Sequence, residues 1–120
     1  MKLTIAGQVR GGKNQMQVDP RTGRHYPNAK WAAWRDAVVM IIKAQSRVQF
    51  TIPLYAEIRY RPGDARRRDV PALQDALWHC LEKAGIVADD SLIQDVNWKT
   101  LNVDRENPGV EIIPSAKGAA

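Results

Sequence analysis

The segment from Asp69 to Gly85 carries a full set of helix signals, and it constrains the fold more than any other stretch. Asp69 stands at an N-cap position, and Pro71 follows in the first turn, where proline is tolerated. Lys83 lies in the last turn and Gly85 just beyond it, as at many helix C-termini. Between them, apolar residues recur at helical spacing and predict one buried face: Leu73, Ala76, Leu77, Cys80, Leu81 and Ala84.

Strand and helix patterns surround this helix. Residues 54–61 alternate between apolar and polar side chains, which is typical of a half-buried strand. Asn28 can cap a second helix over residues 29–45, whose Trp31 and Trp34 we interpret as core residues. Further strands are expected at 3–9, 92–102 and 110–113, with a hairpin or an ordered loop around the turn at residues 20–23.

These elements predict one small domain over residues 1–120, with a frayed tail at 115–120. The order is roughly β-β-α-β-α-β-β, an α/β fold of the α+β type with a mixed sheet and two main helices. The single cysteine, Cys80, excludes an internal disulfide and a cysteine-rich zinc site. Because no signal peptide or membrane-spanning run is visible, we expect a soluble, cytoplasmic protein that does not enter a membrane.

The charge of the chain is divided unevenly. Residues 1–68 hold 14 Lys or Arg and 4 Asp or Glu, a net +10, whereas residues 69–120 hold 4 and 9, a net −5. Three arginines, Arg66, Arg67 and Arg68, directly precede Asp69, and a carboxylate pair, Asp89 and Asp90, follows the helix. Arginines hold phosphates and clustered carboxylates hold Mg²⁺ or Mn²⁺, so this pattern favours an enzyme that acts on a nucleic-acid backbone.

Each carboxylate also has a structural interpretation. Asp69 can simply cap the helix, which contributes about 1 kcal/mol. Asp89 and Asp90 can form an acidic turn before a strand. The metal-site interpretation expects the helix to return the chain to the sheet so that the second carboxylate group approaches Asp69.

Residues 66–77, followed by residues 81–93 with their Gly-Ile-Val-Ala-Asp-Asp turn, resemble the RusA-type Holliday-junction resolvases of phages and prophages. The resemblance implies a small homodimeric endonuclease that needs Mg²⁺ or Mn²⁺ and makes paired cuts in four-way DNA junctions. It implies that Asp69 and Asp90, with Asp89 beside it, are metal ligands. In such an enzyme, Arg66, Arg67 and Arg68 are expected to grip phosphates, while Lys13, Arg21 and Arg24 are expected to contact a second arm of the junction.

The chain departs from the family pattern Asp-x-Asp-Asn-x-x-Lys. Pro71 stands in place of the second aspartate, Ala72 of the asparagine and Asp75 of the lysine. One hypothesis is a rebuilt site in which Asp75 restores the carboxylate and His79 binds metal, donates a hydrogen bond to phosphate or assists proton transfer. The alternatives are a protein that binds branched DNA without cutting it, and a general nucleic-acid- or protein-binding module.

Overall fold

The computed structural model describes residues 1–12 and 16–117. A four-stranded sheet forms its centre, in the spatial order β1-β6-β4-β5. The strands are β1 (Leu3–Ala6), β4 (Leu54–Arg61), β5 (Ile93–Thr100) and β6 (Gly109–Ala116). Strand β6 runs antiparallel to both β1 and β4, whereas β4 and β5 are parallel, so the sheet is mixed as predicted.

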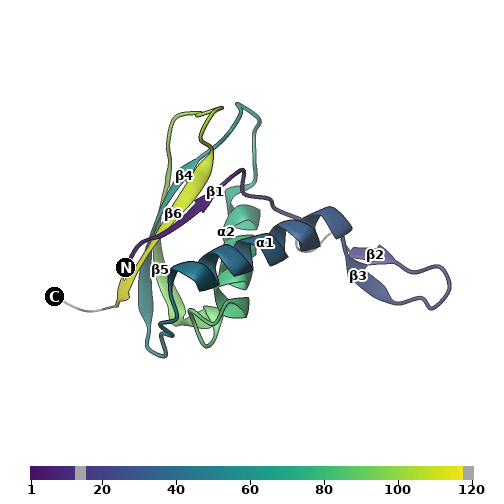
Figure 1. The fold of residues 1–120 in the computed structure, drawn as a ribbon, viewed down its shortest axis with the longest axis horizontal. Coiled ribbons are helices and arrows are strands. Elements are labelled where there is room, and N and C mark those ends of the chain that lie inside the picture. The colour runs from purple at the N-terminus through teal and green to yellow at the C-terminus, as the bar shows by residue number, and fades with distance from the viewer. Residues whose placement is uncertain (13–15, 118–120) are drawn as a thin grey trace.

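Both helices, α1 (Ala29–Gln45) and α2 (Val70–Lys83), cover the same face of the sheet (Figure 1). The alternating side chains of β4 explain this arrangement. Leu54, Ala56, Ile58 and Tyr60 are buried beneath the helices, while the residues between them stay half-buried or exposed on the open face. Fully buried residues of α2, such as Leu77 and Cys80, close the core. Within residues 1–12 and 16–117, neither α1 nor α2 meets the length and hydropathy that a membrane-spanning helix requires.

Helix α2 is the crossover between two parallel strands. It begins after the C-terminal end of β4 and runs back along the sheet, and a short 3-10 helix, η1 (Asp90–Leu92), then leads into β5. Because Leu54 pairs with Ile93, η1 lies beside the start of β4. The two ends of α2 therefore lie at opposite ends of the sheet.

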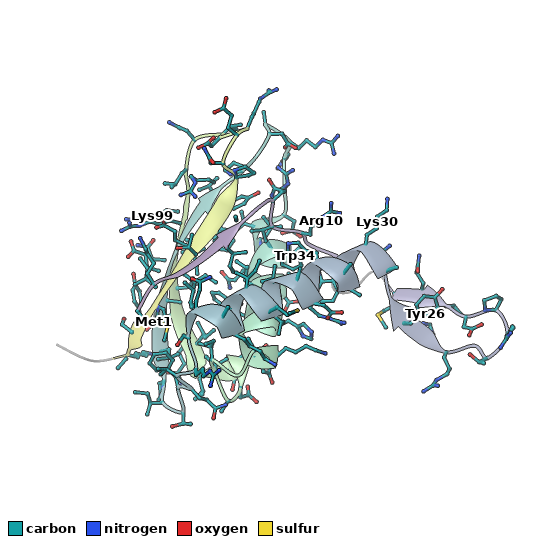
Figure 2. All side chains as sticks on the ribbon, viewed as in Figure 1. Met1, Arg10, Tyr26, Lys30, Trp34 and Lys99 are labelled. Carbon is teal, nitrogen blue, oxygen red and sulfur yellow. The ribbon has the colours of Figure 1, made fainter. Side chains whose placement is uncertain are left out.

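The predicted hairpin is present, formed by β2 (Met16–Val18) and β3 (His25–Pro27). It projects away from the body of the protein beyond the start of α1 (Figure 1), and Tyr26 lies on it (Figure 2). Three strands therefore precede the first helix rather than two. Met16, Val18 and Tyr26 are all exposed, so the hairpin contributes nothing to the core.

Two expected boundaries were wrong. Strand β1 ends at Ala6 rather than at residue 9, because Gly7 turns the chain with a φ of 98°. The tail expected from residue 115 begins later, because Ser115 and Ala116 still pair with Tyr55 and Leu54 of β4.

Candidate functional site

A cleft of about 750 Å³ lies at the end of the sheet where β4 stops. Three segments that are distant in sequence line it: the chain after β1, the start of α1, and the loop that joins β4 to α2. Its charged side chains are four cations and two carboxylates: Arg10, Lys30, Arg66, Arg68, Asp64 and Asp69. Figure 2 shows Arg10 and Lys30 projecting on the same side of α1. This excess of positive charge suits a polyanion.

The loop before α2 is organised by one ion pair. Arg68 donates two hydrogen bonds to Asp64, from Nη1 to Oδ1 at 2.7 Å and from Nη2 to Oδ2 at 3.0 Å. The backbone N–H of Arg66 also donates to Asp64 Oδ1, at 2.9 Å. The Arg68 guanidinium lowers the pKa of Asp64 to about 2, so the carboxylate stays charged at neutral pH.

Gln8 fastens this loop to the rest of the cleft. Its Nε2 donates to the hydroxyl of Tyr60 at 2.5 Å, and its Oε1 accepts from the backbone N–H of Gly63 at 2.8 Å. On the other wall, the indole Nε1 of Trp31 donates to the carbonyl of Arg10 at 3.2 Å. These hydrogen bonds hold in place the loop before α2 and the backbone at Arg10, which carry cationic side chains of the cleft.

Asp69 occupies the N-cap position of α2, but its side chain makes no capping hydrogen bond. Asn28 shows the contrast at the start of α1, since its Oδ1 accepts from the N–H groups of Lys30 and Trp31 at 3.0 and 3.3 Å. The Asp69 residue is exposed and lines the cleft. The Asp69 carboxylate therefore does not cap α2 by a hydrogen bond, which was the structural interpretation that the sequence allowed.

Asp69 and Asp90 do not come together within one chain, contrary to the expectation that α2 returns the second carboxylate group to the first. Helix α2 has 14 residues, which span about 21 Å. The eight residues of β4 give a similar separation of about 23 Å between the ends of the sheet. The reason is topological, because a parallel crossover carries the chain back to the opposite end of the sheet before β5 begins.

The neighbouring acidic residue has a local structural role. The Asp89 side chain caps η1 by accepting a hydrogen bond from the N–H of Ser91 at 2.8 Å. Hydrogen bonding by Ser91 lowers the pKa of Asp89. Asp90, the first residue of η1, is half-buried.

Asp75 and His79 lie further along α2 and do not line the cleft. The imidazole of His79 packs on the indole of Trp31, with ring centroids 5.6 Å apart, in the contact between the two helices. Trp31 is buried, as predicted, and Trp34 is partly buried against the core. The hypothesis of a site rebuilt with Asp75 and His79 therefore gains no support from their positions, and it stays a prediction.

The predicted DNA-binding residues fall into two groups. Arg66 and Arg67 are exposed on the loop before α2, whereas Arg68 is half-buried in its ion pair with Asp64. Arg21 and Arg24 are exposed at the turn of the projecting hairpin, and Lys13 lies outside the described residues. Sequence reasoning missed Asp64, Lys30 and Arg10 as residues of the cleft. Only the spacing of Asp64 four residues before Arg68 could have revealed the first.

The described residues bring two carboxylates to the cleft, Asp64 and Asp69. Among the described residues, no three His, Cys, Asp or Glu side chains gather where they could hold a metal ion. Asp64 is held by Arg68, which leaves Asp69 alone among cations that would repel Mg²⁺. Within the described part of one chain, the cleft therefore holds no cluster of three metal-ligating side chains.

Comparison with known proteins identifies the family. The family model described as endodeoxyribonuclease RusA matches residues 7–113. The chain belongs to the RusA family. The Escherichia coli K12 protein named crossover junction endodeoxyribonuclease RusA is 38% identical over 74 residues, which are 61% of this chain and 62% of that protein.

Two further relatives of the same name resemble the chain over the same length. The protein from Shigella sonnei strain Ss046 is 38% identical, and that from Enterobacteria phage 82 is 36% identical. The match spans less than two thirds of the length of these relatives. The expected resemblance to RusA proteins is thereby confirmed.

Proposed function

We propose that this protein is a junction-resolving endodeoxyribonuclease of the RusA type, which cuts Holliday junctions or other branched DNA. The observation that carries the proposal is Asp69, a carboxylate not used as a helix cap, in a cleft lined by Arg10, Lys30, Arg66 and Arg68. Such a cleft offers the phosphate backbone several cationic contacts beside a carboxylate. The names of the relatives, which describe endodeoxyribonucleases of crossover junctions, support the same activity.

The basic residues have distinct roles in this proposal. Arg66 and Arg67 are exposed and grip phosphates, together with Arg10 and Lys30 on the opposite wall. Arg68 is oriented by Asp64 and stabilises the loop that presents its neighbours. Arg21 and Arg24, on the hairpin, extend the same surface away from the body and reach a second arm of the junction, as does Lys13.

We infer that the metal site forms between two copies of the chain. Asp69 and Asp90 stand at opposite ends of α2, so one ion cannot bind both from the same chain. In a homodimer with twofold symmetry, Asp69 of one copy and Asp90 of the other can meet twice, once at each site. The ion is Mg²⁺ or Mn²⁺, because carboxylate oxygens are the ligands that these ions prefer. Two such sites in one dimer also account for paired cuts. We expect the cutting to occur in the cytoplasm, where the DNA lies.

Subunit mixing tests this proposal. Wild type should cut a synthetic four-way junction with Mg²⁺ or Mn²⁺ but not with EDTA, and should leave a matched linear duplex intact. Asp69→Asn and Asp90→Asn should each bind the junction without cutting it. When the two inactive variants are refolded together, half of the dimers pair the one with the other and regain one intact site. The mixture should then nick the junction with about a quarter of the wild-type site activity.

One control variant and three alternative outcomes complete the test. Glu82→Gln removes an exposed carboxylate from α2 between the two ends and should cut like wild type. If both ligands came from one chain, each mixed dimer would carry two damaged sites and the mixture would stay inactive. If wild type binds the junction but cuts nothing with either ion, the protein is a non-catalytic binder of branched DNA. If Asp75→Asn abolishes cutting as Asp90→Asn does, Asp75 supplies a further ligand.

A further inference from the structure

Strand β5 is an open edge of the central sheet. It is the last strand in the order β1-β6-β4-β5, and all eight of its residues are exposed or half-buried. Exposed apolar side chains lie on it and just beyond it, at Val96, Leu101 and Val103. An edge strand of this length presents a row of unpaired N–H and C=O groups, which can pair with another strand.

The backbone of β5 presents hydrogen-bonding groups outward. The N–H of Leu101 donates to the carbonyl of Tyr60 at 2.7 Å, so it points toward β4. Since successive residues of a strand alternate, the N–H and C=O groups of Val96, Trp98 and Thr100 point the other way, toward the open edge. These groups can form the ladder of a further strand.

The sequence of β5 is complementary to itself. When two copies run antiparallel with Asn97 opposite Asn97, Asp95 faces Lys99 and Val96 faces Trp98, each pair occurring twice by symmetry. Val96 and Trp98 lie beside Ala56 and Ile58 on the helix-covered face, while Asp95 and Lys99 lie on the open face. Moving the pairing by two residues in either direction separates the opposite charges. The register centred on Asn97 therefore matches both charge and apolar surface.

We propose that β5 pairs antiparallel with β5 of a second copy, with the twofold axis at Asn97, so that two four-stranded sheets become one continuous sheet. The approach of Asp90 to Asp69 of the other copy, which this pairing brings about, has a catalytic meaning that rests on the proposed function. Antiparallel pairing places the start of β5 in one copy beside the end of β5 in the other. That end carries Thr100, which pairs within its own chain with Tyr60, near the end of β4. Asp90 of one copy thus moves to the end of the sheet that carries Asp69 of the other.

The opposite edge of the sheet does not offer this. Strand β1 has only four residues, and the order β1-β6-β4-β5 puts it three strands away from β5. A dimer through β1 would therefore leave η1 of each copy far from the cleft of the other. Only the β5 edge combines a long strand with the direction that joins the two carboxylates.

Cysteine cross-linking tests the register. The N–H and C=O groups of Asn97 point toward β4 of their own chain, so the two Asn97 residues would form a pair without mutual hydrogen bonds. In such an antiparallel pair the Cα atoms lie about 4.5 Å apart, within disulfide range. Asn97→Cys should therefore form a covalent dimer on mild oxidation, seen on a non-reducing gel. The native Cys80 is buried, and burial raises the pKa of its thiol to about 12, so it stays reduced in the control. Gln94→Cys should remain uncoupled, because its own copy would be about 20 Å away.

A charge exchange provides a second test. Asp95→Lys or Lys99→Asp alone places like charges opposite each other and should weaken dimerisation, measured by sedimentation. Mixing these two variants should restore it, because each mixed dimer regains two opposite-charge pairs. Within its own chain, Asp95 pairs with Lys117 at 3.3 Å and Lys99 pairs with Glu57 at 3.5 Å. Surface ion pairs contribute little to stability, so each variant should still fold.

The outcomes separate this surface from the proposed activity. A dimer that cuts junctions but gives no Asn97→Cys cross-link overturns the β5 surface and leaves the nuclease proposal standing. A monomeric wild type also overturns it. A cross-linked dimer that cuts nothing with Mg²⁺ or Mn²⁺ supports the β5 surface and overturns the nuclease proposal.

Discussion

Asp69 occupies the N-cap position of α2 without a capping hydrogen bond, and paired alanine substitutions test whether its side chain stabilises the helix. Asn28 Oδ1 accepts two backbone hydrogen bonds at the start of α1, at 3.0 and 3.3 Å. Asn28→Ala should therefore cost about 1 kcal/mol of unfolding free energy. Asp69 makes no such bond at the start of α2 and is exposed, so Asp69→Ala should change stability by less than about 0.5 kcal/mol.

The measurement is thermal unfolding at fixed protein concentration in 1 M NaCl, where a Debye length of about 3 Å screens the exposed charges. For the 120 residues of this chain, 1 kcal/mol corresponds to about 4 °C in Tm. We expect Asn28→Ala to melt about 4 °C lower and Asp69→Ala within about 2 °C of wild type. Asp69→Ser, which retains a capping oxygen but no charge, should lose cutting as completely as Asp69→Ala. A drop for Asp69→Ala that matches Asn28→Ala, and that Asp69→Ser reverses, would refute the reasoning.

Three further predictions follow from individual contacts. Asp64→Asn should be less stable than wild type above about pH 4, because the ion pair with Arg68 lowers the pKa of the native carboxylate from 3.8 to about 2. The difference in unfolding free energy should shrink as the pH falls from 3.8 to about 2, and denaturation at stepped pH measures it. Lys30→Ala should weaken junction binding and flatten the slope of log affinity against log salt by about 0.9, whereas Arg47→Ala, exposed after α1 and outside the cleft, should leave both unchanged. Leu77→Ala, at a fully buried position, should cost about 2 to 5 kcal/mol in urea unfolding.

Local sequence signals predicted most of the elements because the signals and the structure agree. The helix expected over residues 29–45 is α1, and the strand expected over 54–61 is β4. Asn28 caps α1 as its residue type suggested. These features depend on neighbours within a few residues, which a single sequence contains.

The arrangement of the site could be predicted only in part, because it depends on tertiary contacts. Asp69 and Arg66 were found from their cluster, and the structure brings both to one cleft. Lys30 gave no local signal, since it reaches the cleft only because the chain after β1 packs beside the start of α1. The distance between Asp69 and Asp90 depends on β4 and β5 being parallel, which the sequence pattern did not specify.

The length of α2 has a consequence for when the protein can act. If the two carboxylates belong to different copies, a lone subunit carries no complete site, and its fourteen-residue crossover helix guarantees this whatever DNA it meets. At concentrations where most copies are single, the cutting rate should rise with the square of the protein concentration. A newly made subunit could then bind DNA without leaving a nick, and the capacity to cut would arrive only with the second copy, at both strands together.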